Sequence, residues 1–184
     1  MDDLTLYESY LSGNDDALGE LVEKYNTNLV FFLTQYTHNV YDAEDIAADT
    51  FLKIIIKKPK FEGNSSFKTW LYRIAINLAL NYLKKSNRYQ TEEISESVAG
   101  VSSDNIENEV ILSDESKMLH QALKEINPKH SLALRLYYLE GFSLQEIAVI
   151  MKKTYRQVNN IVFFGKKLLK EKLIQMGYEN YEDK

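Results

Sequence analysis

The chain has 184 residues, of which 45% are apolar and 27% are charged, a composition typical of an ordinary soluble globular protein. Cysteine is absent, which excludes disulfides, thiolate zinc sites and a cysteine nucleophile, and is typical of proteins of the reducing cytoplasm. The first residues contain no basic segment followed by an apolar core, and the longest apolar runs are far too short to cross a bilayer. We therefore expect a cytoplasmic location, with no signal peptide and no membrane insertion.

The net charge of −5 conceals a strong variation along the chain. Residues 1–50 contain eleven acidic side chains and a single lysine, whereas residues 51–85 contain eight basic side chains and one glutamate. Residues 86–115 contain eight acids and one arginine, and residues 116–184 contain twelve bases and seven acids. Two basic blocks separated by an acidic block predict two contacts with a polyanion.

Helical periodicity dominates the first half of the chain, which has few glycines and prolines. The predicted helices span residues 4–12, 16–38, 42–57 and 67–85. Pro59 ends the third helix, and residues 61–66 form a polar loop whose last residue, Ser66, is an N-cap candidate. The expected core stripe of the second helix is Leu18, Leu21, Val22, Tyr25, Leu29, Phe32 and Leu33. That of the fourth is Phe67, Leu71, Ile74, Leu78 and Tyr82.

The composition changes at residues 87–113, where large apolar side chains become sparse and Ser, Asn and acidic residues dominate. This composition predicts a flexible acidic linker. Four short helices are predicted after it, at about 114–126, 128–140, 144–152 and 155–173. The expected fold is therefore all-α, with two small helical domains joined by the linker. The predicted domain boundaries are 1–86 and 114–176, with a tail at 177–184.

The last two predicted helices form a helix-turn-helix pattern, because a turn of about three residues separates them. So short a turn suits a helix that holds its neighbour in a DNA major groove. The final helix has an inner stripe of Val158, Val162, Leu169 and Leu173. Its opposite face carries side chains that suit base edges and phosphates, namely Arg156, Asn159, Asn160, Phe163, Lys166, Lys167 and Lys170. The alternative is a solvated amphipathic helix in a small bundle.

The predicted helix 67–85 carries a second candidate surface. An aromatic ring, two amides and two cations share one face, at spacings of three and four: Trp70, Arg73, Asn77, Asn81 and Lys84. Such a face can stack and hydrogen-bond unpaired bases beside a phosphate track. Lysines surround the preceding loop, and the small polar residues of that loop leave room for an extruded base. The alternative is that Trp70 is partly buried core and that the lysines only favour solubility.

An acidic group, Asp42, Glu44, Asp45 and Asp49, forms the third candidate site. Asp42, Asp45 and Asp49 share one helical face with Ile56 nearby, which allows three interpretations. The first is capping of a helix whose positive end favours acids. The second is a Mg²⁺ site, for which further ligands and a substrate pocket are missing. The third, which we favour, is a mixed acidic and apolar face that docks on a basic partner.

The order and spacing of these motifs resemble those of one protein family. Asp42-Ala43-Glu44-Asp45-Ile46, Asp49-Thr50-Phe51-Leu52-Lys53 and residues 67–77 (Phe-Lys-Thr-Trp-Leu-Tyr-Arg-Ile-Ala-Ile-Asn) resemble the second conserved region of bacterial sigma factors. Residues 139–148 (Leu-Glu-Gly-Phe-Ser-Leu-Gln-Glu-Ile-Ala) resemble the helix-turn-helix of their fourth region. The two-domain plan without a third region is similar to the extracytoplasmic-function (ECF) group of the sigma-70 family.

The resemblance implies a dissociable transcription initiation subunit, with no catalytic residues and no cofactor or metal. Its implied partners are core RNA polymerase, through the β′ clamp helices and the β flap, and promoter DNA as duplex and as melted non-template strand. The residues implied for polymerase docking are Asp42, Glu44, Asp45, Asp49 and Lys53. Those implied for the minus-ten element are Phe61, Asn64, Ser65, Lys68, Trp70, Arg73, Asn77, Asn81 and Lys84, with residues 61–66 capturing a flipped base. Those implied for the minus-thirty-five element are Arg156, Asn159, Asn160, Phe163, Lys166 and Lys167.

The sequence also departs from the family pattern. The recognition helix of the group usually carries basic residues near the positions of Asn159, Ile161 and Phe164, and here all three are uncharged. A weaker or altered minus-thirty-five contact follows, because phosphate contacts supply much of the affinity for duplex DNA. An alternative interpretation of this helix is that Phe163 and Phe164 are exposed and form a surface that binds an anti-sigma protein. A stand-alone helix-turn-helix regulator is the alternative function, although no zipper-like dimerisation helix is present.

Overall fold

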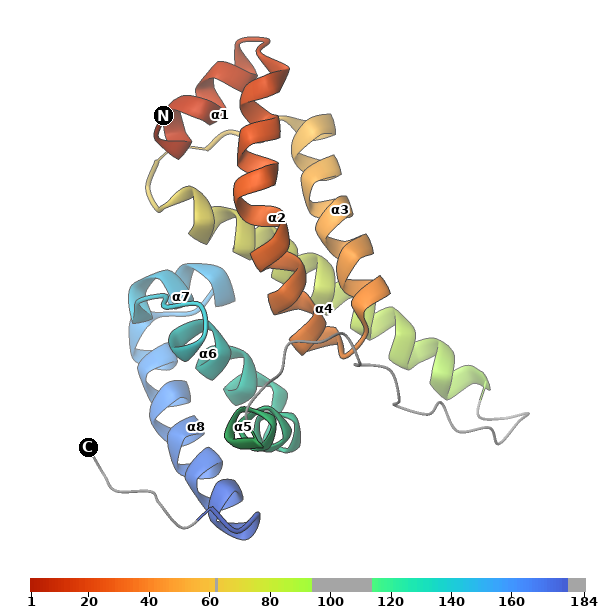
Figure 1. Cartoon of the computed structure of the whole chain (residues 1–184), viewed down its shortest axis with the longest axis vertical. Coiled ribbons are helices and arrows are strands. Elements are labelled where there is room, and N and C mark those ends of the chain that lie inside the picture. Colours follow the sequence, from red (N-terminus) through yellow and green to blue (C-terminus); the bar gives the residue numbers. More distant parts are fainter. Residues whose placement is uncertain (62, 94–113, 179–184) are drawn as a thin grey trace. The chain divides into compact units, whose positions relative to one another are not determined.

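A computed structural model of the chain describes residues 1–61, 63–93 and 114–178 (Figure 1). Within these ranges every regular element is an α-helix, which confirms the predicted fold class. The chain divides into two compact units, residues 1–107 and 108–184. The predicted linker residues 94–113 and the end of the tail, 179–184, lie outside the described residues.

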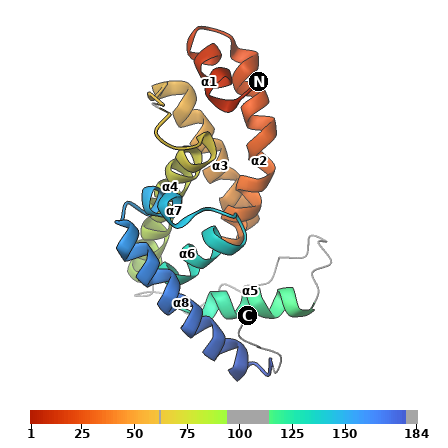
Figure 2. The same cartoon turned by 90° about the vertical axis from the view of Figure 1, so that its left-hand side faces the viewer.

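The described residues of the first unit form four helices, α1 (Asp3–Leu11), α2 (Asp15–Thr37), α3 (Val40–Lys57) and α4 (Phe67–Glu93). Helices α2 and α3 lie side by side, α1 packs on α2, and α4 crosses the pair diagonally (Figures 1 and 2). Its core takes side chains from all four helices, among them Leu6, Tyr7, Tyr10, Leu21, Leu29, Phe32, Leu33, Ile46, Phe51, Ile54, Phe67, Leu71, Tyr72 and Ile76. Each large apolar side chain that is fully buried contributes about 1.5–3 kcal/mol, so this core stabilises the unit.

Local side chains set the ends of α3 and α4. The Asn39 carboxamide oxygen accepts a hydrogen bond from the Tyr41 backbone N–H at 2.9 Å and caps α3. At the other end Lys58 adopts a left-handed conformation, with φ of 39°, directly before Pro59. The Ser66 hydroxyl accepts a hydrogen bond from the Thr69 backbone N–H at 3.1 Å, as the sequence predicted for the start of α4. The segment between α3 and α4 is therefore short and fixed at both ends.

Helix α4 differs from the prediction in its length and in its core stripe. It continues to Glu93, beyond the predicted end at Lys85 and into the segment predicted as linker. The predicted stripe was partly wrong, because Ile74 and Leu78 are half-buried and Tyr82 is exposed. The buried residues of α4 are Phe67, Thr69, Leu71, Tyr72, Ala75, Ile76 and Ala79. Counting only large apolar residues missed the alanines, whose small side chains allow neighbouring helices to approach closely.

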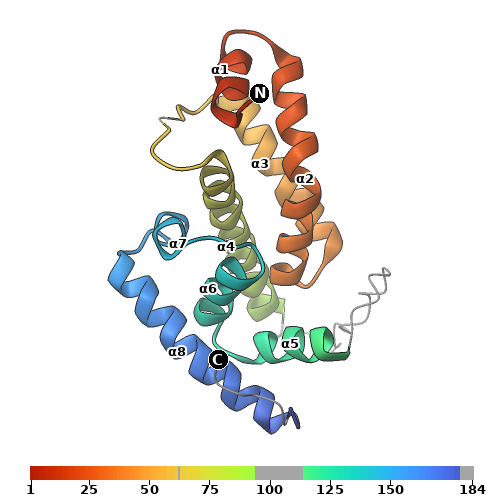
Figure 3. The same cartoon turned by 60° about the vertical axis from the view of Figure 1, so that its left-hand side comes forward.

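The second unit contains α5 (Asp114–Glu125), α6 (Pro128–Tyr138), α7 (Leu144–Met151) and α8 (Tyr155–Gln175). Helix α8 extends along one side of this unit, with α7 near its start and α5 beside its second half (Figure 3). The core is made of Ala122, Leu123, Leu132, Leu134, Leu136, Phe142, Ile147, Ile150, Val158, Ile161, Val162, Leu169 and Leu173. The predicted inner stripe of the last helix is therefore confirmed.

Two capping boxes hold α7 and α8 in a helix-turn-helix. Ser143 and Glu146 satisfy each other's backbone N–H groups at the start of α7, and Thr154 and Gln157 do the same at the start of α8. Lys152, at φ of 52°, ends α7 and leaves a turn of the predicted length before α8. The two helices therefore have the tight connection that the sequence indicated.

Helix α8 approaches α6 closely at Gly165. A β-carbon at this position would lie 3.3 Å from side-chain atoms of Leu134 and His130, closer than most packed contacts. In the same region the Nδ1 atom of His130 lies 2.8 Å from the carbonyl oxygen of Ile161. These contacts fix the rotation of α8 and so determine which of its faces is exposed.

The half-buried imidazole of His120 predicts a pH-dependent stability of the second unit. Burial, with the positive charges of Arg135 and Lys124, lowers the pKa of His120 below its ordinary value of 6.5. The folded state then binds fewer protons than the unfolded state, so stability is lost as pH falls below about 6.5. Hydrogen exchange of α5 and α6, corrected for intrinsic rates, should therefore accelerate between pH 7 and pH 5. The His120→Leu variant should lose this component, and an equal pH slope in both proteins would contradict the prediction.

Candidate nucleic-acid and partner interfaces

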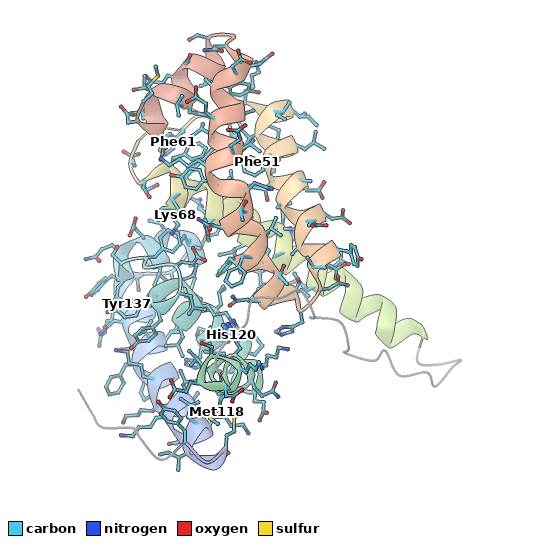
Figure 4. The ribbon with its side chains drawn as sticks, in the orientation of Figure 1. Phe51, Phe61, Lys68, Met118, His120 and Tyr137 are labelled. Atoms are coloured by element: carbon cyan, nitrogen blue, oxygen red, sulfur yellow. The ribbon has the colours of Figure 1, made fainter. Side chains whose placement is uncertain are left out.

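Four aromatic rings form a cluster where the segment before α4 meets α1. Trp70 lies 5.3 Å from both Tyr7 and Phe61 between ring centroids, and Phe67 lies 5.8 Å from the same two rings. Figure 4 shows Phe61 among the side chains that fill the space between α1 and the start of α4. We call Tyr7, Phe61, Phe67 and Trp70 the aromatic cluster. Tilted and edge-on pairs of this kind stabilise a fold beyond the area that they bury.

The cluster places two of the predicted minus-ten residues, Phe61 and Trp70, partly inside the protein. Both are half-buried, and their ring contacts are with Tyr7 and Phe67. Trp70 is therefore partly buried in the core, which was the alternative interpretation of this residue in the sequence. The sequence pattern placed Trp70 correctly on the face of Asn77 and Asn81, but α1 covers the first turn of that face.

Beyond its first turn, α4 presents the polar face that the sequence predicted. Arg73, Asn81 and Lys84 are exposed, and Asn77 is half-buried. The Asn77 amide donates a hydrogen bond to the Arg73 backbone carbonyl, one turn earlier. Lys68 is half-buried, with its ammonium 5.4 Å from the ring centroid of Tyr72. The α4 face, as we call Arg73, Asn77, Asn81 and Lys84, thus combines amides and cations on one rigid helix.

Small polar residues lie between Phe61 and the start of α4. Gly63 has φ of 70°, a conformation that suits glycine, and Asn64 beside it is exposed. Ser65 is half-buried, and its hydroxyl donates to the Ser66 carbonyl at 3.4 Å. We call residues 63–66 the loop; Glu62 before it lies outside the described residues.

Helix α3 exposes a face that is both acidic and apolar. Glu44, Asp45 and Asp49 are exposed, whereas Lys53 is half-buried. The large apolar side chains exposed on this helix are Tyr41, Leu52, Ile55 and Ile56, with 75% of Tyr41 and 70% of Ile56 accessible. This mixed α3 face supports the docking interpretation of the acidic group, because an isolated domain rarely leaves such side chains together in water.

Asp42, the remaining acid of the group, has an internal partner. The Tyr82 hydroxyl donates a hydrogen bond to the Asp42 carboxylate at 2.7 Å, which links α3 to α4. This bond to the carboxylate raises the pKa of Tyr82. Asn39 occupies the N-cap position of α3, so Asp42 lies in the first turn and is not the cap. Glu44 also lines an open depression of about 420 Å³ between α2 and α3.

The exposed face of α8 carries every residue predicted for duplex contact. Arg156, Asn159, Asn160, Phe163, Lys166 and Lys167 are all exposed, and Lys170 is half-buried. The Lys167 ammonium lies 4.9 Å from the Phe163 ring centroid, and that of Lys166 lies 5.3 Å from the ring of Tyr138 on α6. Of the two apolar residues at positions where the group usually has basic ones, Ile161 is buried in the core of the unit and Phe164 is exposed.

Sequence reasoning missed the contribution of α1. The helix was predicted, but Tyr7 and Tyr10 received no role, although both are buried. A signal was present, because two tyrosines three residues apart form an aromatic stripe that the short helix cannot bury by itself. Phe61, Phe67 and Trp70 are the aromatic residues in the sequence on which such a stripe can pack.

Neither a metal site nor a membrane span is found in the described part of the chain. There, no three His, Asp or Glu side chains come together in a way that could hold a metal ion. Likewise, no helix among these residues is both long and apolar enough to cross a bilayer.

Comparison with known families gives a consistent assignment for both units. The family model for Sigma-70 region 2 matches residues 21–89, and that for Sigma-70 region 4 matches residues 116–169. The RNA polymerase sigma factor YlaC of Bacillus subtilis is 30% identical over 166 residues, which cover 89% of this chain and 96% of that protein. The ECF RNA polymerase sigma-E factor of Escherichia coli is 30% identical over 183 residues, covering 93% and 94%. The chain belongs to the ECF group of the sigma-70 family.

Solved structures share the fold, among them that of a sigma factor. The sigma factor RpoE of Bartonella quintana, crystallised with the anti-sigma factor NepR, has a TM-score of 0.71 at 22% identity, covering 87% of this chain and 98% of that one. CnrH, in complex with the cytosolic domain of CnrY, has a TM-score of 0.68 at 18% identity, covering 95% and 98%. In family terms, the first unit holds region 2 and the second holds region 4.

The aromatic cluster predicts that Trp70→Ala destabilises region 2. A core tryptophan replaced by alanine costs about 3–5 kcal/mol, and for the half-buried Trp70 we expect about 2 kcal/mol. Urea unfolding followed by circular dichroism should show this loss, and Trp70→Phe should retain most of the stability. Wild-type stability of Trp70→Ala would mean that the ring is free for a ligand.

Proposed function

We propose that this sigma factor joins core RNA polymerase and directs it to promoters, where it also helps to open the DNA. The observation that carries the proposal is the order of three exposed surfaces along one chain of this family. These are the acidic and apolar α3 face, the amide-rich α4 face with the loop before it, and the exposed face of the helix-turn-helix. The first suits a protein partner, and the other two suit DNA.

The α3 face is the proposed docking site for the polymerase, through the clamp helices of β′. Asp45 and Asp49 supply negative charge, and Ile56 supplies apolar area that is exposed in the free protein. A contact of this composition gains hydrophobic burial at its centre and electrostatic selection at its rim. Asp42 serves the same face indirectly, because its bond to Tyr82 fixes α3 against α4.

The loop and the α4 face are the proposed site for the minus-ten element as a melted non-template strand. The loop holds a base that has left the duplex, with Asn64 and Ser65 in contact with it. Asn77, Asn81 and the cations of the α4 face then follow the strand. Trapping an unstacked base offsets part of the few kcal/mol that unpairing costs. Phe61 and Trp70 act mainly by fixing the shape of this site, since their rings pack in the aromatic cluster.

The exposed face of α8 is the proposed reader of the minus-thirty-five duplex. Asn159 and Asn160 have the donors and acceptors that base edges require in the major groove, and Arg156, Lys166 and Lys167 suit phosphates. Asparagine in place of the group's usual basic residue lowers the expected phosphate contribution at this helix. We therefore expect the polymerase to supply part of the promoter affinity, by holding two weak DNA contacts at a high effective concentration.

In this proposal the chain works in the cytoplasm and supplies no catalytic group, because bond formation belongs to the polymerase. A stand-alone regulator of the helix-turn-helix class would need tight duplex binding without polymerase, usually as a dimer. The exposed docking surface on α3 favours the sigma factor function over that alternative.

Loss of the acidic charges on α3 should weaken polymerase binding. For Asp45→Ala combined with Asp49→Ala, we expect the affinity for core polymerase to fall about tenfold or more, because charge complementarity at the interface is removed. Binding can be measured by fluorescence anisotropy of the labelled chain. The control, Glu20→Ala with Glu23→Ala, removes the same charge from exposed positions of α2. Equal affinities for both double variants would contradict the docking proposal.

The asparagines of α8 should determine upstream promoter preference. Each good base contact supplies about 1–3 kcal/mol of discrimination, so Asn159→Ala or Asn160→Ala should flatten the preference at one or two base pairs. Transcription from a library randomised in the minus-thirty-five element measures this preference. The control is Gln175→Ala, which removes an exposed amide at the far end of the same helix. An unchanged preference in both asparagine variants would refute their assignment.

A further inference from the structure

Helix α1 is fastened to α2 by one acidic side chain. The Asp3 carboxylate lies 2.5 Å from the Lys24 ammonium, and it accepts a hydrogen bond of 2.5 Å from the Tyr25 hydroxyl. The region 2 family model begins at residue 21, so α1 lies outside the matched segment. The helix is nevertheless an integral part of the unit, because Leu6, Tyr7 and Tyr10 are all buried.

From this position α1 contacts the connection between α3 and α4 at several points. The Tyr7 hydroxyl donates a hydrogen bond of 2.6 Å to the Pro59 carbonyl, and the Tyr7 ring packs on Phe61 and Trp70. The Leu4 side chain lies beside Gly63, since a β-carbon on that glycine would be 3.7 Å from it. Tyr10 points elsewhere, with its hydroxyl 3.4 Å from the Ile55 carbonyl on α3.

These contacts restrict the segment in addition to the hydrogen bonds that Ser65 and Ser66 make at its end. The loop itself contains only small polar residues. Gly63 adopts a positive φ easily because it has no β-carbon, and the same lack leaves its backbone free to take other conformations. A loop that must receive an extruded base binds it more tightly when its backbone is already in the receptive shape, because less conformational entropy is then lost. Tyr7 and Leu4 restrict the backbone of the segment in this way, through their contacts with Pro59 and Gly63.

We propose that α1 is a positioning element for base capture, in which Tyr7 and Leu4 hold Pro59, Phe61 and residues 63–66 in the shape that accepts the unpaired minus-ten base. This role rests on the proposed function of the loop. Neither residue touches the DNA in the proposal, so both are positioning residues. Because the Tyr7 hydroxyl is buried, its removal leaves the Pro59 carbonyl without that donor.

Promoter opening by core polymerase with Tyr7→Phe or Leu4→Ala tests the proposal. We expect open-complex formation to slow about 3- to 10-fold for Tyr7→Phe, the effect of one lost buried hydrogen bond. Leu4→Ala should act in the same direction. Because the Leu4 side chain is partly exposed, its truncation should leave the domain folded, so unfolding would not explain slower promoter opening. The matched control is Tyr10→Phe, which removes a buried hydroxyl from the same helix that faces α3 instead of the loop.

Promoters with a single abasic site distinguish positioning from general destabilisation. Each non-template position of the minus-ten element is made abasic in turn, and the site that slows the wild-type protein most marks the captured base. The penalty from that abasic site should be smaller for Tyr7→Phe and Leu4→Ala than for wild type, while core polymerase binding stays unchanged. Wild-type opening rates for both variants, or an undiminished abasic penalty, would overturn the proposal. If the wild-type chain opened no promoter, the proposed function itself would fail, and the positioning role with it.

Discussion

Burial of the aromatic cluster is the constraint on which the first unit depends. Tyr7, Phe61, Phe67 and Trp70 come from α1, from the segment before α4 and from α4 itself, so one packed group joins three parts of the chain. Once those rings face each other, the side chains left for a ligand are the small polar residues of the loop and the amides and cations farther along α4. The cluster thus separates the structural part of this surface from the part that can bind.

The same separation between core and exposed face recurs in the other elements. Helix α3 buries Ile46, Phe51 and Ile54 and leaves Glu44, Asp45, Asp49 and Ile56 in water. Helix α8 buries Val158 and Ile161 and leaves Asn159 and Asn160 exposed. An isolated protein gains nothing from exposed isoleucines or from a row of exposed amides. Their presence on three helices is understandable if each face is completed by polymerase or by DNA.

The sequence predicted the fold closely but predicted the sites only in part. Helix positions followed from periodicity and capping, because Asn127-Pro128, Ser143 with Glu146 and Thr154 with Gln157 act through local contacts that sequence spacing reveals. The core stripe of α4 and the burial of Trp70 depend on contacts with α1 and α2, which are distant in sequence. The tyrosine pair of α1 indicated an aromatic face to be buried, but no local pattern could show that its partner is the first turn of α4. Nor could one show that Tyr82 bonds to Asp42 across 40 residues.

In the proposed function, this chain selects promoters only as a part of RNA polymerase. Mapping the 5′ ends of transcripts made in vitro on genomic DNA, by core polymerase with and without the purified chain, tests it most directly. We expect a set of start sites that depends on the chain and shares upstream sequence elements. Identical start sites in both reactions would contradict it, even if the chain bound DNA by itself.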